Sequence, residues 1–120
     1  MSISNYLEDQ LLDATAGSSY ASAGTYLQLH TGDPGEAGTA NVATESSRES
    51  VSFASASGGS MASSGTVTWT NVAGSETFTH WSLWDAASSG NCLWSGSLAS
   101  SAVVVAGDSF SISLLTLTLD

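Results

Sequence analysis

The side chains able to do nucleophilic or metal chemistry are few in this sequence and lie far apart. They are two histidines, His30 and His80, a single cysteine, Cys92, and a large number of serines. A zinc site needs three or four converging nitrogen, sulfur or oxygen ligands, and neither histidine has a second His or Cys at ligand spacing. No Gly-x-Ser-x-Gly segment marks a serine nucleophile, and Cys92 has no cationic neighbour in the sequence to activate its thiol. We therefore expect no catalytic residue, no metal site and no cofactor, and we expect that the protein is not an enzyme.

Four acidic residues lie within or beside one glycine-rich segment: Asp33, Glu36, Glu45 and Glu49. Hard cations such as Ca²⁺ bind carboxylate oxygens of this kind. The spacing does not match an EF-hand, and a solvated acidic loop explains the same residues. Calcium binding by this loop is therefore kept only as an alternative to a purely solvated loop.

The charge balance is strongly acidic, with eleven Asp and Glu, Arg48 as the sole Lys or Arg, and a formal net charge of −10. Lys and Arg are the residues that bind nucleic-acid phosphates and anionic membranes. No apolar run approaches the roughly 20 residues of a membrane-spanning helix. The first residues do not resemble a secretory signal, and a lone cysteine fits synthesis in a reducing cytosol. We expect neither nucleic acid nor a membrane as a partner.

Residues 2–16 are predicted to form a short N-terminal helix. Ile3, Leu7 and Leu11 recur every four residues, with Leu12 alongside, and form a narrow apolar stripe. Ser2 or Ser4 can cap the first turn, and Gly17 can end the last one. A helix this short is marginal alone, so its apolar stripe must pack against another surface.

The rest of the chain has the period-two patterning of β-strands separated by polar turns. A long loop at 32–49 and a loose Gly/Ser-rich connection at 56–64 interrupt the strands, and a change of apolar parity near Leu114 predicts a β-bulge. The length of 120 residues suits one domain. We predict a mainly β fold over residues 1–120, a single antiparallel β-sandwich of jelly-roll or immunoglobulin-like type with the one helix. The seven predicted strands are 25–31, 50–55, 66–72, 77–85, 91–98, 103–105 and 109–119.

Two of the four tryptophans, Trp81 and Trp84, are separated by an odd number of residues within one predicted strand. An ideal strand places them on opposite faces, so we expect one in the core and the other on the exterior of the sheet. Large exposed aromatic side chains are typical of protein interfaces, and they also form platforms for sugars. A protein interface and a sugar platform are therefore the two alternative roles of the exterior indole.

Four blocks of the sequence resemble a family of small virion proteins of tailed bacteriophages and prophages, whose members are labelled tail-fibre-like or structural. The blocks follow the family's order and span nearly the whole chain; they are 2–13 (SISNYLEDQLLD), 26–35 (YLQLHTGDPG), 79–87 (THWSLWDAA) and 117–120 (LTLD). The sequence departs from the family around residues 45–50, where Arg48 alone echoes an Ala-Arg-Gln run. No catalytic or metal-binding residue is implied by the resemblance.

The resemblance and the charge together predict a non-enzymatic virion structural protein. Our leading hypothesis is a capsid cement or decoration protein on the exterior of the virion, made in the host cytoplasm. Its expected partners are the major capsid protein or other virion proteins, and sister copies in a homo-oligomer. The alternatives are a tail or tail-fibre attachment component and, in another class, a carbohydrate-binding module for host recognition. The residues predicted to contact partners are Leu7, Leu11, Arg48, Trp81 and Trp84.

Overall fold

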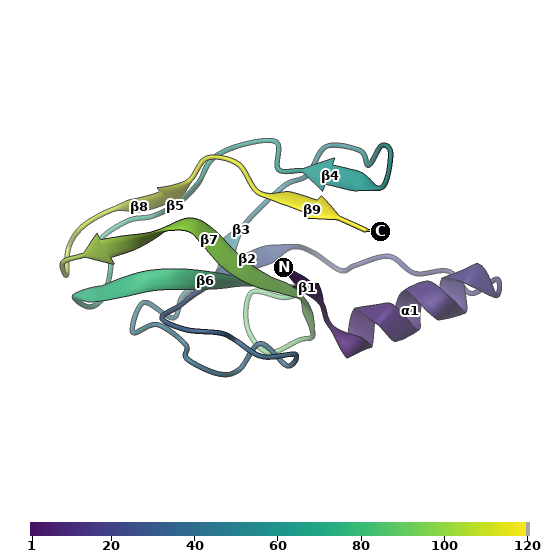
Figure 1. The fold of residues 1–120 in the computed structure, drawn as a ribbon, viewed down its shortest axis with the longest axis horizontal. Coiled ribbons are helices and arrows are strands. Elements are labelled where there is room, and N and C mark those ends of the chain that lie inside the picture. The colour runs from purple at the N-terminus through teal and green to yellow at the C-terminus, as the bar shows by residue number, and fades with distance from the viewer. Residues whose placement is uncertain (120) are drawn as a thin grey trace.

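The structure is a computed structural model that describes residues 1–119, and it is mainly β (Figure 1). Asp120, the last residue of the predicted domain, lies outside the described residues. The predicted combination of a mainly β fold with one short N-terminal helix is confirmed. The elements found within residues 1–119 are β1 (Ser2–Ile3), α1 (Asn5–Thr15), β2 (Tyr26–His30), β3 (Glu49–Ser50), β4 (Ser60–Ala62), β5 (Val67–Trp69), β6 (Glu76–Trp84), β7 (Cys92–Val104), β8 (Phe110–Ile112) and β9 (Thr116–Thr118).

Helix α1 begins three residues later than predicted, because Ser2 and Ile3 form strand β1 instead. Ser4 is the N-cap: its Oγ accepts from the Leu7 N–H at 3.2 Å and donates to the carbonyl of Cys92 at 2.6 Å. One serine thus begins the helix and fastens it to β7. The helix ends before Gly17, whose φ of +107° is the left-handed conformation that suits glycine. Within residues 1–119, no helix has the length and apolar character needed to cross a membrane.

Five strands form one antiparallel sheet in the order β1-β7-β6-β2-β3. Its centre is the β6–β7 hairpin, with β2 paired along the other side of β6 so that Leu29 faces Trp81 and His30 faces His80. The predicted hairpin is therefore correct. The two strands predicted at 91–98 and 103–105 are one continuous strand, β7.

A large bulge in β7 lies between the two predicted strands, and it explains why one strand was predicted as two. His80 pairs with Ser97 and Phe78 with Ala102, so Thr79 alone lies opposite residues 98–101. The bulge also changes which residues of β6 point inward, because Phe78 and Trp81 have opposite parity yet both lie in the core.

The second layer consists of two separate two-stranded ribbons, β5–β8 and β4–β9. This layering differs from the jelly-roll and immunoglobulin-like arrangements we predicted, each of which has two continuous sheets. The loose connection predicted at 56–64 is wrong, since β4 lies within it and pairs with β9. The parity change near Leu114 is real. It is made by a break between β8 and β9, which exposes Leu114 and buries Leu115.

The main core fills the space between the five-stranded sheet and the two ribbons. It contains side chains of β2, β6 and β7 from one layer and of β5, β8 and β9 from the other. The opposite face of the sheet is also buried, because the loop 31–48 folds back across it and places Pro34 inside. Helix α1 extends from one end of the molecule, whose overall dimensions are 48 × 25 × 22 Å (Figure 1).

The close packing of Gly96 in β7 against Trp81 gives a first prediction. A Cβ added at Gly96 would lie 2.7 Å from Cζ2 of the Trp81 ring, which is itself buried in the core. We expect Gly96→Ala to lower the free energy of unfolding by about 1–3 kcal/mol, because the ring must move within a packed core. Urea unfolding measures the change.

Gly65 provides the matched control. It is exposed, has no positive φ, and a Cβ added there would have no neighbouring atom within 4 Å. Gly65→Ala should be neutral or slightly stabilising, since alanine restricts the unfolded chain. Equal effects of the two substitutions would contradict the described packing of Trp81.

Candidate functional site

The apolar stripe of α1 is divided between the core and the surface. Leu7 is buried against the core, whereas Leu11 packs on its margin and is half-buried. Leu12, which was predicted alongside the stripe, is 68% exposed. The helix therefore has more apolar surface than its packing against the sheet uses.

A groove runs between this side of the helix and the last strand. It has a volume of about 420 Å³, and we call it the helix groove; its lining is Ile3, Glu8, Leu11, Leu12, Thr15 and Leu119. Leu119 also lines a neighbouring apolar pocket of about 230 Å³, together with Met61, Trp94 and Leu117. A continuous apolar surface thus extends from α1 across the end of β9 towards β4.

The polar border of the helix groove is acidic. Glu8 lines the groove, and Asp9 and Asp13 are exposed on the same helix. The last turn of α1 has no basic residue, so nothing on the helix offsets the partial negative charge of its C-terminal carbonyls. A partner that covers this surface needs apolar side chains for its floor and cations for its border.

Trp81 and Trp84 lie on opposite faces of β6, as predicted. Trp81 belongs to the main core at 3% exposure, but Trp84 is not exterior: it is 6% exposed beneath the loop 31–48. Trp69 and Trp94 are buried as well. The expectation of an exposed indole is wrong, because the folded-back loop covers the outer face, and the sugar platform that depended on such an indole is absent from residues 1–119.

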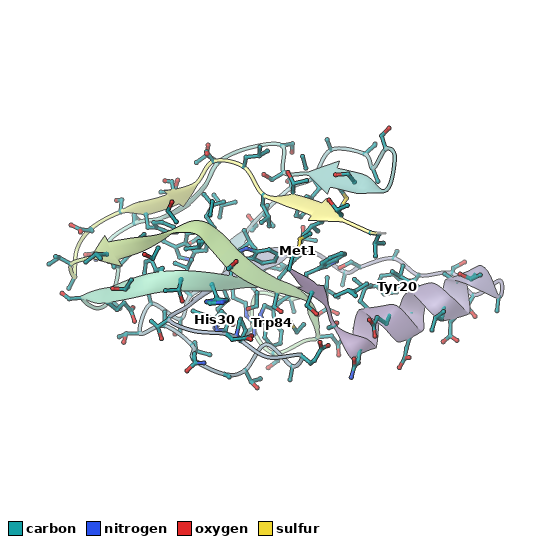
Figure 2. All side chains as sticks on the ribbon, viewed as in Figure 1. Met1, Tyr20, His30 and Trp84 are labelled. Atoms are coloured by element: carbon teal, nitrogen blue, oxygen red, sulfur yellow. The ribbon has the colours of Figure 1, made fainter. Side chains whose placement is uncertain are left out.

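Trp84 belongs to a buried hydrogen-bond network centred on Ser82. The Trp84 indole N–H donates to Ser82 Oγ at 2.7 Å, and the same Oγ lies 2.7 Å from Nε2 of His30. His30 Nδ1 lies 2.9 Å from the carbonyl of Ala40 in the covering loop, which requires an N–H on Nδ1. Every atom is then satisfied with a neutral imidazole that accepts from Ser82. Figure 2 shows His30 and Trp84 next to each other under the sheet.

The pair of Ser82 and His30 has the distance of a nucleophile and its base, but both side chains are fully buried at 0% exposure. Burial lowers the pKa of His30, which favours the neutral ring that the network needs. Cys92 is also buried, and burial raises the pKa of its thiol to about 11. The thiol is therefore protonated at neutral pH and lacks nucleophilic character.

Arg48 holds the covering loop to the turn between β6 and β7. Its Nη1 donates to the carbonyls of Ala86 at 2.8 Å and Ser89 at 2.7 Å, and its guanidinium lies 3.9 Å from the centre of the Trp84 ring. Nε donates to Gln28 Oε1 at 3.4 Å. The guanidinium is therefore occupied within the chain. Of the five residues predicted to contact a partner, Leu11 alone is both half-buried and part of the lining of an open groove.

The acidic residues of the loop bind backbone amides separately. Asp33 accepts from the Gly35 N–H at 2.9 Å, and Glu45 accepts from the Ala73 N–H at 3.1 Å. Glu76, outside the loop, accepts from the N–H groups of Thr44 and Glu45. In the described part of the chain, no three His, Cys, Asp or Glu side chains are grouped so that they could hold a metal ion.

Two parts of this site were not predicted from the sequence. The helix groove depends on Leu12 and Leu119, and the signal available was an apolar residue on the otherwise polar side of the helix. The network depends on the register that brings residues 30 and 82 together, and no local pattern specifies that register.

Comparison with known protein families gives one finding that covers nearly the whole chain. The model of the family described as Podophage GP4 fiber I protein gp80 matches residues 2–120. No curated protein matches the chain.

The position of Arg48 predicts that its shape matters as well as its charge. Arg48→Lys keeps the charge, and an ammonium can donate to both carbonyls, but it lacks the planar face that lies over the Trp84 ring and the Nε–H that donates to Gln28. We expect both Arg48→Lys and Arg48→Ala to lower the free energy of unfolding by about 1–2 kcal/mol, with alanine the larger loss. Urea unfolding followed by tryptophan fluorescence measures it. Wild-type stability in the lysine variant would show that the planar guanidinium contributes nothing beyond its charge and its two carbonyl contacts.

The burial of His30 leads us to expect that the folded chain loses stability in mild acid. Its pKa is lowered in the folded chain from the ordinary value of 6.5, so the unfolded chain binds the proton first. The contribution of neutral His30 to the free energy of unfolding is complete above pH 6.5. It is lost as the pH falls from 6.5 towards the lowered folded pKa, by at most about 1.4 kcal/mol per pH unit. Urea midpoints between pH 7.5 and the lowest pH at which His30 stays neutral, together with an NMR titration of the imidazoles, test this.

His80→Gln is the control for that titration, because His80 is half-buried and outside the network. The acid dependence should persist in this variant. A urea midpoint that does not change with pH, or a pH dependence that disappears in His80→Gln, would show that His30 does not cause the loss of stability in acid.

Proposed function

The chain belongs to this family of phage fibre proteins, and we propose that it is a non-enzymatic structural component of a fibre on the exterior of the virion. The observation that supports the proposal is the family match over residues 2–120. It favours the tail-fibre alternative over the capsid cement role that we first preferred. Association with other virion proteins follows from a place in a fibre, and we include several copies of the chain in the proposal.

The charge distribution supports a position away from packaged DNA. The chain has a net charge of −10, and its single Arg is already bound to two carbonyls and an indole. No Lys or free Arg remains to neutralise phosphates, so nothing offsets the repulsion between the net charge of the chain and a nucleic acid.

The helix groove is the surface proposed to join the chain to another virion protein. Its floor is apolar, its border is acidic, and the chain has no free Lys or Arg to place against that border. A second copy of the chain would bring carboxylates together, whereas a different virion protein with an apolar ridge flanked by Lys or Arg fits both features. The partner in this proposal is therefore a basic segment of another virion protein.

A non-enzymatic role is supported by the state of the reactive side chains. Ser82 and His30 are enclosed, and the Cys92 thiol stays protonated at neutral pH. Ser82 and His30 lie beneath the loop 31–48, which is held by Arg48. Cys92 lines an open pocket of about 410 Å³, but its thiol is protonated there.

Localisation on purified virions tests the proposal directly. A phage that lacks this chain is supplied with it in trans, and immunogold electron microscopy with an antibody to the chain locates it on the particles. We expect labelling on fibres. Labelling confined to the head shell would restore the cement role, and a chain absent from washed virions would overturn the structural proposal.

Replacement of Leu12 tests the attachment surface in the same system. Leu12→Asp adds a charge to the apolar floor at an already exposed position, so folding should be unaffected while incorporation falls at least about tenfold. Quantitative mass spectrometry of virions measures incorporation. Thr66→Asp adds the same charge at an exposed position outside the lining and should incorporate normally. Normal incorporation of Leu12→Asp would exclude the helix groove as the attachment site.

A further inference from the structure

The second half of β7 has an unpaired edge. Strand β1 covers β7 only at Trp94 and Ser95, and from Ser97 to Val104 the strand pairs with β6 alone within the described chain. We call residues 97–104 the β7 edge. An edge of this kind presents N–H and C=O groups in the geometry that another strand binds.

A groove lies directly beside this edge. It has a volume of about 440 Å³ and runs between β7 and the segment that joins β8 to β9, with Trp81 in its wall. Leu98 lines it from β7, and Leu114 lines it from the other side with 62% of its surface exposed. Val103 on the edge itself is 80% exposed. Apolar side chains and unpaired backbone groups therefore lie together on one surface.

The β7 edge has no charge and no proline to prevent it from pairing with another strand. Soluble proteins protect long edges with Lys, other charges, Pro or β-bulges. Residues 86–107 contain no charged residue and no proline. The bulge at 98–101 interrupts the edge, but residues 102–104 beyond it pair regularly with β6 on one side and have no strand partner on the other within the described chain.

Charge identifies what can occupy this surface. Every copy of the chain has a net charge of −10, so two copies repel wherever carboxylates face one another. Carboxylates are absent from residues 86–107, from the ribbon segment 50–75 and from residues 109–119. Asp108, between the first and last of these regions, is bound to the N–H of Val105. Two carboxylates lie near the ends of the β7 edge: Asp33 lines a pocket with Ser97, and Glu76 is paired with Val104 but is bound to two N–H groups of the loop. The groove and the middle of the β7 edge are thus the surface that a second acidic copy can approach with the least opposing charge.

We propose that the β7 edge and the adjoining groove form the contact between copies of this chain. The proposal rests on the proposed function, because a fibre built of several copies needs a contact between them. The surface lies on the sheet and ribbons, whereas the helix groove lies beside α1 at the other end of the molecule (Figure 1). One surface can therefore join copies while the other binds a different protein.

The purified chain tests this proposal in the analytical ultracentrifuge, over a range of concentrations at about 10 mM and about 1 M NaCl. Salt reduces the distance over which like charges repel from roughly 30 Å to roughly 3 Å. Self-association through an uncharged surface should therefore strengthen as salt is raised. Amides of residues 97–104 should exchange more slowly with deuterium as the fraction of associated chain rises.

Two variants of equal net charge locate the contact. Val103→Glu places a carboxylate on the β7 edge, whereas Leu12→Glu places one at a similarly exposed position in the helix groove. We expect Val103→Glu to weaken association at least about tenfold and Leu12→Glu to leave it unchanged. Leu114→Glu, across the groove, should act like Val103→Glu and serves in its place if circular dichroism shows that Val103→Glu is misfolded.

Several outcomes would overturn the proposal. They are a chain that stays monomeric at every concentration and salt tested, association that weakens with salt, and equal effects of the Val103 and Leu12 substitutions. Each of these leaves the location of the chain on virions unaffected, so failure here is distinguishable from failure of the fibre role.

Discussion

The centre of the five-stranded sheet, at β2 and the second half of β6, is buried on both faces, and the chain has a single Arg and no Lys with which to neutralise what it buries. A buried polar group without a partner is costly, so each one needs a hydrogen bond inside the protein. On the outer face this is achieved with neutral groups: Ser82 accepts from one ring and donates to another, and His30 reaches the loop that covers it. These hydrogen bonds, with those of Arg48 to Ala86 and Ser89, hold the loop against the sheet.

The carboxylates follow the same principle. In most acidic proteins Lys and Arg offset part of the negative charge, but here backbone N–H groups do so. Glu76 accepts from the N–H groups of Thr44 and Glu45 in the loop. Glu45 in turn accepts from the N–H of Ala73, which follows β5. Hydrogen bonds to a charged acceptor are about twice as strong as neutral ones, so two carboxylates can fix the end of a loop without any cation. The arrangement leaves most of the remaining acidic side chains on the helix and the loops.

How much of this was predictable depends on whether the signal was local. The capping serine, the leucine spacing and Gly17 specify α1, and alternation specifies β2 and β6. The parity change near Leu114 predicted a β-bulge, whereas it marks a break at which the chain passes from the ribbon β5–β8 to the ribbon β4–β9. Strand β4 escaped prediction because Ser60 and its neighbours have strand character only through pairing with β9, which is distant in sequence. The prediction that either Trp81 or Trp84 is exterior failed for a similar reason, since a loop with no apolar pattern of its own covers Trp84.

The same lack of lysine has a consequence for survival outside a cell. Digestive proteases that cut after Lys or Arg find a single peptide bond to attack in 120 residues, the one that follows Arg48. That side chain is held by Ala86, Ser89 and Trp84, and strand β3 begins at the next residue. Cleavage there requires local opening of the covering loop, so resistance to this class of enzyme depends on how rarely one segment detaches.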